Sequence, residues 1–293
     1  MTELRKAWLG ACTAPFTQRI RKRDLMNFAA GVQSHRRAYY DDRAKGGIAS
    51  FPTFSARISW HAVRALWAAL HEQGCPPEVA DRQVHYRTEI RNMRDFVPGE
   101  EIVVQARVKD MRWHRAGTLM ETEVSMKTPS GELVCLEMVE GLLRGIDCDD
   151  PSPQATRASR FPAAAEAVPV WENLFTISRL LPYHYDGCAD IHFPIHSSPA
   201  YATDVGLPGV IVQGSATLAV CVDKLVDWLV PGDQQVQVSE ISANYGAYLL
   251  PETQVRLVAH ACAHTEALTE VVFSLIGEDH QEIIRHGYLK LCR

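Results

Sequence analysis

Apolar residues that recur every three or four positions mark one long helix in each half of the chain. In the second half, Leu218, Val222 and Leu225 belong to such a series, which begins after Gly214. In the first half, a comparable series begins after Phe54. This spacing is typical of a helix with a broad buried face. The pattern therefore predicts two helices that must pack against other parts of the fold.

Segments that alternate apolar with polar residues follow each of these helices. Such alternation predicts antiparallel strands with one face against the core and the other in water. The strands are expected at 84–93, 101–113, 118–128 and 132–145 in the first half, and at 234–245, 253–263, 268–277 and 282–291 in the second. Shorter strands are expected at 16–20 and 173–181, and a further helix at 22–32. A helix followed by a run of antiparallel strands, twice over, predicts the α+β class.

Residues 148–169 are expected to form a linker between the two halves. This stretch is rich in Pro, Ala, Ser and Asp and has no sustained apolar period. It divides the chain into residues 1–147 and residues 170–293. Because both parts show the same order of elements, we interpret them as an internal duplication whose sequence identity has been lost.

Composition places the chain among ordinary globular proteins. Its 293 residues suffice for two cores, and 46% are hydrophobic while 22% are charged. No apolar run is long enough for a membrane span, and the first residues lack the apolar core of a signal peptide. The eight cysteines include no CxxC pair, which favours reduced thiols over a disulfide framework. We therefore expect a cytoplasmic protein without a membrane partner.

Charge is distributed unevenly along the sequence. Basic residues are in excess in the first half and acidic residues in the second, within a net charge of −5. A basic half can attract an anionic ligand group such as a nucleotide or phosphopantetheine, or it can be plain solvated surface. No nucleic-acid-binding motif accompanies the charge, so nucleic acid is not an expected partner.

Titratable side chains gather directly before the second long helix. The segment YHYDGCADIHFPIH, expected to be a loop, runs from Tyr183 to His196. This order favours a curved sheet wrapped around a central helix, with the active site at the N-terminus of that helix. The spacing of His192 and His196 could suit zinc on a helix. Pro194 lies between them and no third ligand emerges, so no metal is expected.

Positions in and after this segment resemble the motif of the MaoC-like (R)-specific enoyl-CoA hydratases and dehydratases. The matching residues are Tyr185, Pro194, Ile195, His196, Ala202, Ile211, Val212 and Gly214. The resemblance covers nearly the whole chain. It implies a fused double hotdog, in which each half is a curved antiparallel sheet wrapped around a central helix. The first half resembles the degenerate hotdog of that family, and the second half carries the motif.

Some positions depart from the motif. Ile191 stands where the family has its catalytic Asp, and Phe193 stands where it has an Asn. Gln213 replaces the usual His before the glycine, and Asp190 lies one residue too early. A one-residue bulge could carry the Asp190 carboxylate into the usual place, since loops tolerate such insertions. The same carboxylate could instead cap the backbone or face water.

The resemblance implies acid–base chemistry on 2-enoyl or 3-hydroxyacyl thioesters of coenzyme A or an acyl carrier protein, without metal or redox cofactor. An imidazole titrates near neutrality, which makes His196 the candidate acid–base group. Asp190 is the candidate partner, with His192 as its alternative. The amide of Gly214 would hold the thioester oxygen, because helix N-termini leave N–H groups free. His192, Gln213 and Tyr185 are expected to contact substrate.

Other functions remain open because Ile191 replaces the usual Asp. One alternative is another hotdog thioester enzyme, such as a thioesterase, isomerase or cyclase. Another is a non-catalytic acyl-binding protein. The first half is expected to enlarge the acyl pocket and to offer Arg36, Arg37 or Lys45 to phosphate groups. The fused pair already supplies a pseudo-dimer, and a further homodimer is left open. Fatty acid or polyketide metabolism is the implied setting.

Overall fold

The fold is described from a computed structural model. It covers residues 3–44, 46–152, 168–232, 234 and 236–292. The strands are β1 (Glu3–Leu4), β2 (Phe16–Arg19), β3 (Gln83–Asn92), β4 (Glu101–His114), β5 (Gly117–Lys127), β6 (Leu133–Arg144), β7 (Asp147–Cys148), β8 (Trp171–Thr176), β9 (Gln237–Tyr245), β10 (Gln254–His264), β11 (Leu268–Ile276) and β12 (Glu282–Cys292). The helices are α1 (Lys22–Val32), α2 (Ser55–Glu72), α3 (Pro77–Asp81), α4 (Leu181–Ala189), α5 (Pro199–Asp204) and α6 (Gly214–Leu229), with 3-10 turns η1 (Lys6–Trp8), η2 (Arg37–Tyr39) and η3 (Pro194–His196).

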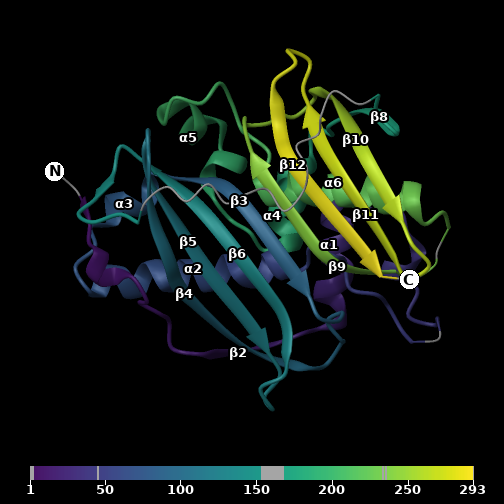
Figure 1. Cartoon of the computed structure of the whole chain (residues 1–293), viewed down its shortest axis with the longest axis horizontal. Coiled ribbons are helices and arrows are strands. Elements are labelled where there is room, and N and C mark those ends of the chain that lie inside the picture. The colour runs from purple at the N-terminus through teal and green to yellow at the C-terminus, as the bar shows by residue number, and fades with distance from the viewer. Residues whose placement is uncertain (1–2, 45, 153–167, 233, 235, 293) are drawn as a thin grey trace.

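One antiparallel sheet of ten strands runs through both halves of the molecule (Figure 1). Its order is β2-β4-β5-β6-β3 from the first half, followed by β9-β12-β11-β10-β8 from the second. Strands β3 and β9 pair at the junction, with Arg87 opposite Asn244 and Arg91 opposite Glu240. The strand order of the second half is therefore the reverse of the order in the first half. Main-chain hydrogen bonds between β3 and β9 join the two halves.

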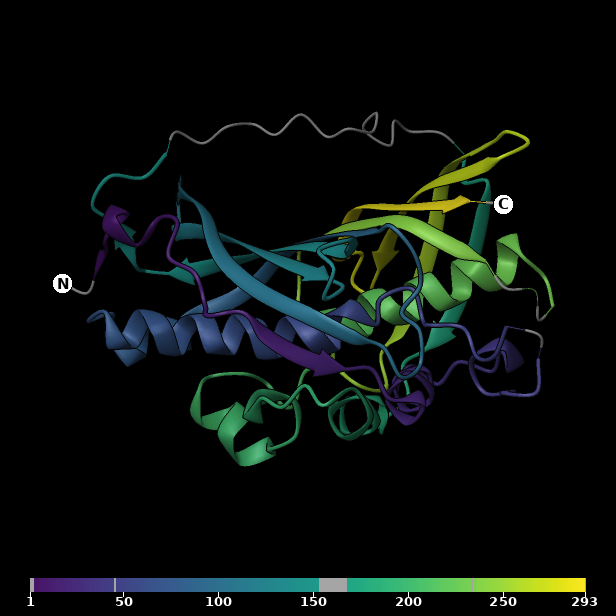
Figure 2. The same cartoon turned by 90° about the horizontal axis from the view of Figure 1, so that it is seen from below.

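Helices α2 and α6 lie end to end along one face of the sheet (Figures 1 and 2). Their N-terminal ends point toward the middle of the molecule. In α6, Leu218, Val222 and Leu225 are almost fully buried, as the apolar period predicts. Burial of each such side chain contributes about 1.5–3 kcal/mol. The α+β class, both long helices and the helix at 22–32 are thus confirmed.

The segment before α6 is more helical than the sequence pattern predicts. The strand expected at 173–181 is only partly right, because β8 ends at Thr176 and α4 begins at Leu181. The expected loop contains most of α4. Leu181, Tyr185 and Ala189 lie four residues apart and are all buried, which is a helical period too short to stand out.

Close packing against α1 explains this helix. A side chain on Gly31 of α1 would come within 2.9 Å of Cys188 in α4, so the two helices touch through the glycine. The rings of Phe28 and Tyr185 meet edge to face at 5.6 Å. Contacts between segments more than 150 positions apart therefore stabilise α4, and local sequence reasoning cannot include them.

The predicted linker falls largely on residues 153–167, which lie outside the described residues. Cys148, assigned to the linker, instead forms β7 and pairs in parallel with β1. The division into residues 1–147 and 170–293 stays a prediction. In the part of the chain that the structure covers, no helix has the length and hydropathy that crossing a membrane requires.

Candidate active site

His196 closes the short turn η3, and its imidazole is turned toward the main chain ahead of α6. Its Nδ1 lies 2.8 Å from the carbonyl oxygen of Ile211. A carbonyl can only accept, so Nδ1 carries the proton and Nε2 is left with a free lone pair. Burial lowers the pKa of His196, and the bond to Ile211 only partly opposes that effect. The side chain is therefore a neutral base near pH 7.

Gly214 is the first residue of α6, three positions after Ile211. The N–H groups in the first turn of a helix have no partner within the helix. Within the described residues, no hydrogen bond uses the Gly214 N–H. A Cβ at this position would lie 3.2 Å from His85 Nδ1 and 3.3 Å from Tyr245 Cε1. Glycine thus lets two side chains approach the start of the helix closely.

Gln213 and Tyr185 are buried beside the start of α6. The Gln213 side chain donates from Nε2 to the carbonyl of Pro182 at 3.0 Å, which ties α6 to α4. Its Oε1 has no partner with hydrogen-bond geometry in the described part of the chain, and neither has the Tyr185 hydroxyl. Burial raises the pKa of Tyr185, which stays protonated. The site therefore holds an acceptor and a hydroxyl that a bound molecule could engage.

Asp190 lies at the C-terminal end of α4 with a left-handed backbone, φ 58°. Its carboxylate accepts from Arg57 at 3.2 Å and from His61 Nε2 at 3.1 Å, both on α2. It also accepts from His192 Nε2 at 2.9 Å. Burial alone would raise the pKa of Asp190, but Arg57 and His61 hold it below its ordinary value. Asp190 is therefore an ionised group bound to the helix of the other half.

This ion-pair network extends in both directions from Asp190. Arg57 also lies 3.6 Å from Asp24 of α1, which binds Arg21 through both oxygens at 2.9 Å. His192, an exposed side chain, faces Asp186 at 2.8 Å through its Nδ1. Both ring nitrogens of His192 thus meet carboxylates, and the bond to Asp186 is the main cause of its raised pKa. The network fastens the segment that carries His196 to α1 and α2.

Apolar residues fill the positions where the family motif has polar ones. Ile191 is buried and belongs to the hydrophobic core. Phe193 packs edge to face on His196, with ring centroids 6.3 Å apart. The structure thus brings together His196, Gly214, Gln213 and Tyr185. It draws Asp190 and His192 into contacts with Arg57, His61 and Asp186 instead.

Sequence reasoning missed two residues at the start of α6, one from each half. His85 lies on β3 and Tyr245 on β9, with ring centroids 4.4 Å apart. Both fall within correctly predicted strands, and nothing in the local pattern separates them from ordinary strand residues. Only the pairing of β3 with β9 brings His85 to the N-terminus of α6.

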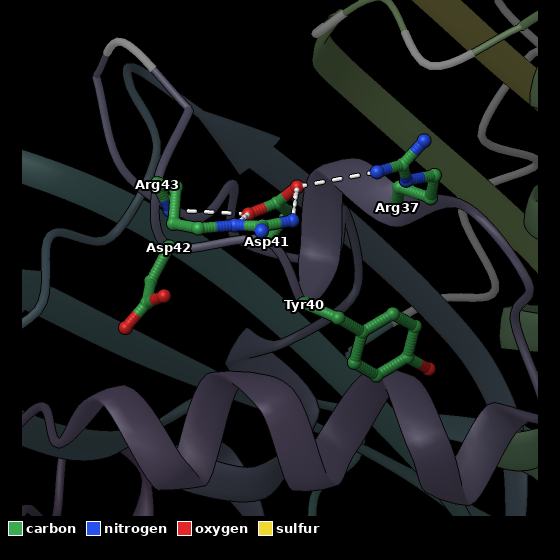
Figure 3. Close-up of a pocket in the computed structure, with 5 residues that line it drawn as sticks. All are labelled: Arg37, Tyr40, Asp41, Asp42 and Arg43. Atoms are coloured by element: carbon green, nitrogen blue, oxygen red, sulfur yellow. Dashed lines mark hydrogen bonds and ion pairs between the residues drawn. The ribbon is translucent and has the colours of Figure 1, made fainter.

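A hollow elsewhere on the surface includes Arg37, one of the predicted phosphate contacts, but none of the predicted catalytic or substrate-binding residues. It is lined by Arg37, Tyr40, Asp41, Asp42 and Arg43. Figure 3 shows the Asp41 carboxylate between the two guanidinium groups, 2.8 Å from Arg43 and 3.4 Å from Arg37. Because Asp41 and Asp42 together offset the charges of Arg37 and Arg43, the hollow offers little attraction to a phosphate.

Of the other two predicted phosphate contacts, the structure describes only Arg36. Arg36 is buried and donates to Asp227 at 3.1 Å and to the carbonyls of Val230 and Gln234 at 2.9 Å. Its guanidinium therefore holds the end of α6 in place. Lys45 lies outside the described residues. No group of three or more His, Cys, Asp or Glu in the described ranges is arranged to hold a metal ion.

Comparison with known proteins places this arrangement in the double hotdog class. A family model described as FAS1-like, dehydratase domain region, matches residues 7–137. A MaoC-like dehydratase from Phytophthora capsici has 17% identity and a TM-score of 0.77, with 94% of each chain covered. A conserved hypothetical protein from Mycobacterium tuberculosis, described as having a double hotdog fold, has 12% identity and a TM-score of 0.63, with 97% of this chain and 96% of that one covered.

A third similar structure is full-length peroxisomal multifunctional enzyme type 2 from Drosophila melanogaster. It has 16% identity and a TM-score of 0.70, with 96% of this chain but 48% of that chain covered. No curated protein sequence matches this chain. The predicted resemblance to MaoC-like dehydratases is confirmed at the level of the fold, and the fold is a double hotdog.

Proposed function

We propose that the protein is a hydratase/dehydratase that interconverts 3-hydroxyacyl and 2-enoyl thioesters. The observation that carries this proposal is the hydrogen bond from His196 Nδ1 to Ile211, three residues before the free amide of Gly214. It leaves a basic Nε2 next to the positive end of a helix. Removing a proton next to a thioester carbonyl needs both a base and a donor for the enolate oxygen.

In the dehydration direction, His196 Nε2 takes the proton from C2 of the substrate. The Gly214 N–H, supported by the dipole of α6, stabilises the charge that develops on the thioester oxygen. Gln213 Oε1, which has no partner in the described chain, and the Tyr185 hydroxyl, which lies beside Ser215, offer hydrogen bonds to the bound thioester. His192 lies at the exposed edge of the same segment, which suits a contact with the carrier.

The contacts of Asp190 favour a positioning role. Its two oxygens are already used by Arg57, His61 and His192. Its catalytic role stays a prediction.

We also propose a carrier thioester of coenzyme A or an acyl carrier protein, a cytoplasmic setting and no cofactor. The N-terminal hotdog forms the wall of the pocket opposite α6, and the C-terminal hotdog carries the motif. A further homodimer remains a proposal that sedimentation or light scattering would decide.

A thioesterase is the second candidate, and the buried Ile191 favours it. Without a carboxylate at that position, the site has one group fewer for the departing hydroxyl. Hydrolysis of a thioester needs a positioned water and the same oxygen site, and His196 could activate that water.

Product analysis separates these reactions. The purified protein would be incubated with a 2-enoyl-CoA and with a 3-hydroxyacyl-CoA. Loss or gain of the conjugated enoyl absorbance reports hydration, and release of free thiol reports hydrolysis. We expect hydration and dehydration, and His196→Ala should lower kcat by about 10²–10⁴-fold.

His280→Asn is the matched control. His280 is exposed in a turn with φ 58°, a conformation that asparagine also adopts. Free thiol without hydration would favour the thioesterase. Tight thioester binding without turnover, unchanged in His196→Ala, would favour a non-catalytic acyl-binding protein.

A further inference from the structure

His85 is a partly buried imidazole from the N-terminal hotdog that lies at the proposed active site of the C-terminal one. It belongs to β3, the strand that joins the two halves through β9. Its Nδ1 is 3.2 Å from the place where a Cβ would stand on Gly214. The imidazole therefore lies directly over the first residue of α6, beside the amide proposed to bind the thioester oxygen.

A chain of hydroxyl groups fixes the orientation of this ring. His85 Nε2 lies 2.7 Å from Thr88 Oγ1, and the Tyr245 hydroxyl donates to the same Oγ1 at 3.5 Å. Because Thr88 Oγ1 accepts from Tyr245, its own proton is free to be donated to His85 Nε2. When Thr88 donates in this way, the ring proton of His85 stands on Nδ1, the nitrogen that faces Gly214.

The ring is neutral under ordinary conditions. Burial lowers the pKa of His85 to about 4, and the nearby His196 acts in the same direction. A hydrogen bond with the main chain of Arg87 opposes these two effects. A neutral imidazole N–H in a buried site is a hydrogen-bond donor whose proton is not lost to water.

We propose that His85 Nδ1–H is the second donor to the thioester oxygen, alongside the N–H of Gly214. This inference rests on the proposed function and adds a catalytic residue from the other hotdog. Two converging donors stabilise an enolate oxygen better than one, and each such donor contributes about 10²–10³ in kcat.

With this donor pair the reaction needs only one base. His196 Nε2 takes the C2 proton, and the electron pair of the C2–H bond moves onto the thioester oxygen held by Gly214 and His85. The enolate then collapses, the C3–O bond breaks, and His196 returns its proton to the departing hydroxyl. The products are the 2-enoyl thioester and water, so atoms and charge balance without a carboxylate at the position of Ile191.

Paired variants of His85 test this role. His85→Leu removes the donor, whereas His85→Asn retains an amide N–H near the position of Nδ1. We expect His85→Leu to lower kcat by about 10²–10³-fold with a much smaller change in KM. His85→Asn should recover at least about tenfold of that loss, and His280→Asn should match the wild type.

Thr88→Val tests the orientation independently, since it removes the partner of Nε2 without touching the ring. It should lower kcat about tenfold, because a misplaced donor loses part of its effect. If His85→Leu does not fold, the Asn and Thr88→Val variants still decide the outcome. Thermal melts of all variants identify any loss of folding.

The outcomes separate this inference from the proposed function. His85 and Thr88 variants within about twofold of wild type, together with an inactive His196→Ala, would overturn the role of His85 and leave the hydratase intact. A wild-type protein without activity on any enoyl or 3-hydroxyacyl thioester would instead remove the proposed function itself.

Discussion

Glu137 and His85 should give the stability of this protein two opposing dependences on pH. Glu137 lies on β6, is only 2% exposed, and its Oε2 has no partner with hydrogen-bond geometry in the described chain. Burial raises the pKa of Glu137 from 4.5 to about 7, although Ser55 and Ser59 at the start of α2 pull it down. Burial lowers the pKa of His85 from 6.5 to about 4.

The magnitudes follow from these pKa differences. One pKa unit corresponds to 1.36 kcal/mol, so the titration of each group changes the unfolding free energy by about 3 kcal/mol. Below pH 4.5, Glu137 is protonated in both the folded and unfolded states. As pH rises from 4.5 to 7, the unfolded chain ionises first, so stability falls by about 3 kcal/mol and then stays level. For His85 the unfolded chain binds the proton first as pH falls from 6.5 to 4, so stability falls in that direction.

Between pH 4.5 and 6.5 the two effects oppose each other, and single variants separate them. The assay is urea unfolding of wild type, Glu137→Gln and His85→Asn from about pH 4 to about pH 8, with the difference in unfolding free energy plotted against pH. Relative to wild type, Glu137→Gln should gain about 3 kcal/mol on raising the pH, and His85→Asn should gain a similar amount on lowering it.

Glu266→Gln, an exposed change in the turn between β10 and β11, is the control and should give a flat difference. A flat difference for Glu137→Gln would refute the reasoning for that residue. It would mean that Glu137 is ionised in the folded protein at neutral pH, with water or another group paired to it.

Three further predictions concern the site. Gly214→Ala should lower kcat by up to about 10²-fold, since the new Cβ presses on His85 at 3.2 Å; kinetics within about twofold of wild type would contradict it. Asp190→Asn should lower the unfolding free energy by about 1 kcal/mol, because Arg57 loses its nearest carboxylate. Its kcat should fall less than about 10²-fold, and a loss as large as that of His196→Ala would make Asp190 catalytic. On the acid side, kcat/KM should decline with an apparent pKa below 6.5, because burial lowers the pKa of the base His196. An apparent pKa above 6.5 would contradict this.

Most of the fold could be predicted because its signals are local. The period of α6 and the alternation in β9 to β12 extend over enough residues to identify each element. Helix α4 was missed because only three of its buried residues share the helical spacing, and the helix packs on Gly31 of α1. The resemblance in the motif supplied the double hotdog, which no periodicity alone distinguishes from other α+β folds.

The site was only partly predictable for a different reason. His196 and Gly214 lie in one segment of sequence, so their proximity follows from the motif. The partners of Asp190 lie on α2, and His85 reaches Gly214 only because β3 pairs with β9. These contacts join residues more than 100 positions apart, so the sequence pattern does not reveal them. The position of Asp190 in the motif region led to a predicted catalytic role, which its ion pairs do not favour.

The seam between β3 and β9 has a consequence for the independence of the halves. The outer edges of the sheet are the short strands β2 and β8, whereas β3 and β9 are long and lie at its centre. A half expressed alone would expose one of these long strands with a row of unsatisfied main-chain groups, a known template for aggregation. Each half therefore covers the long strand that the other would expose. Because both halves lie in one chain, they are always made in equal amounts.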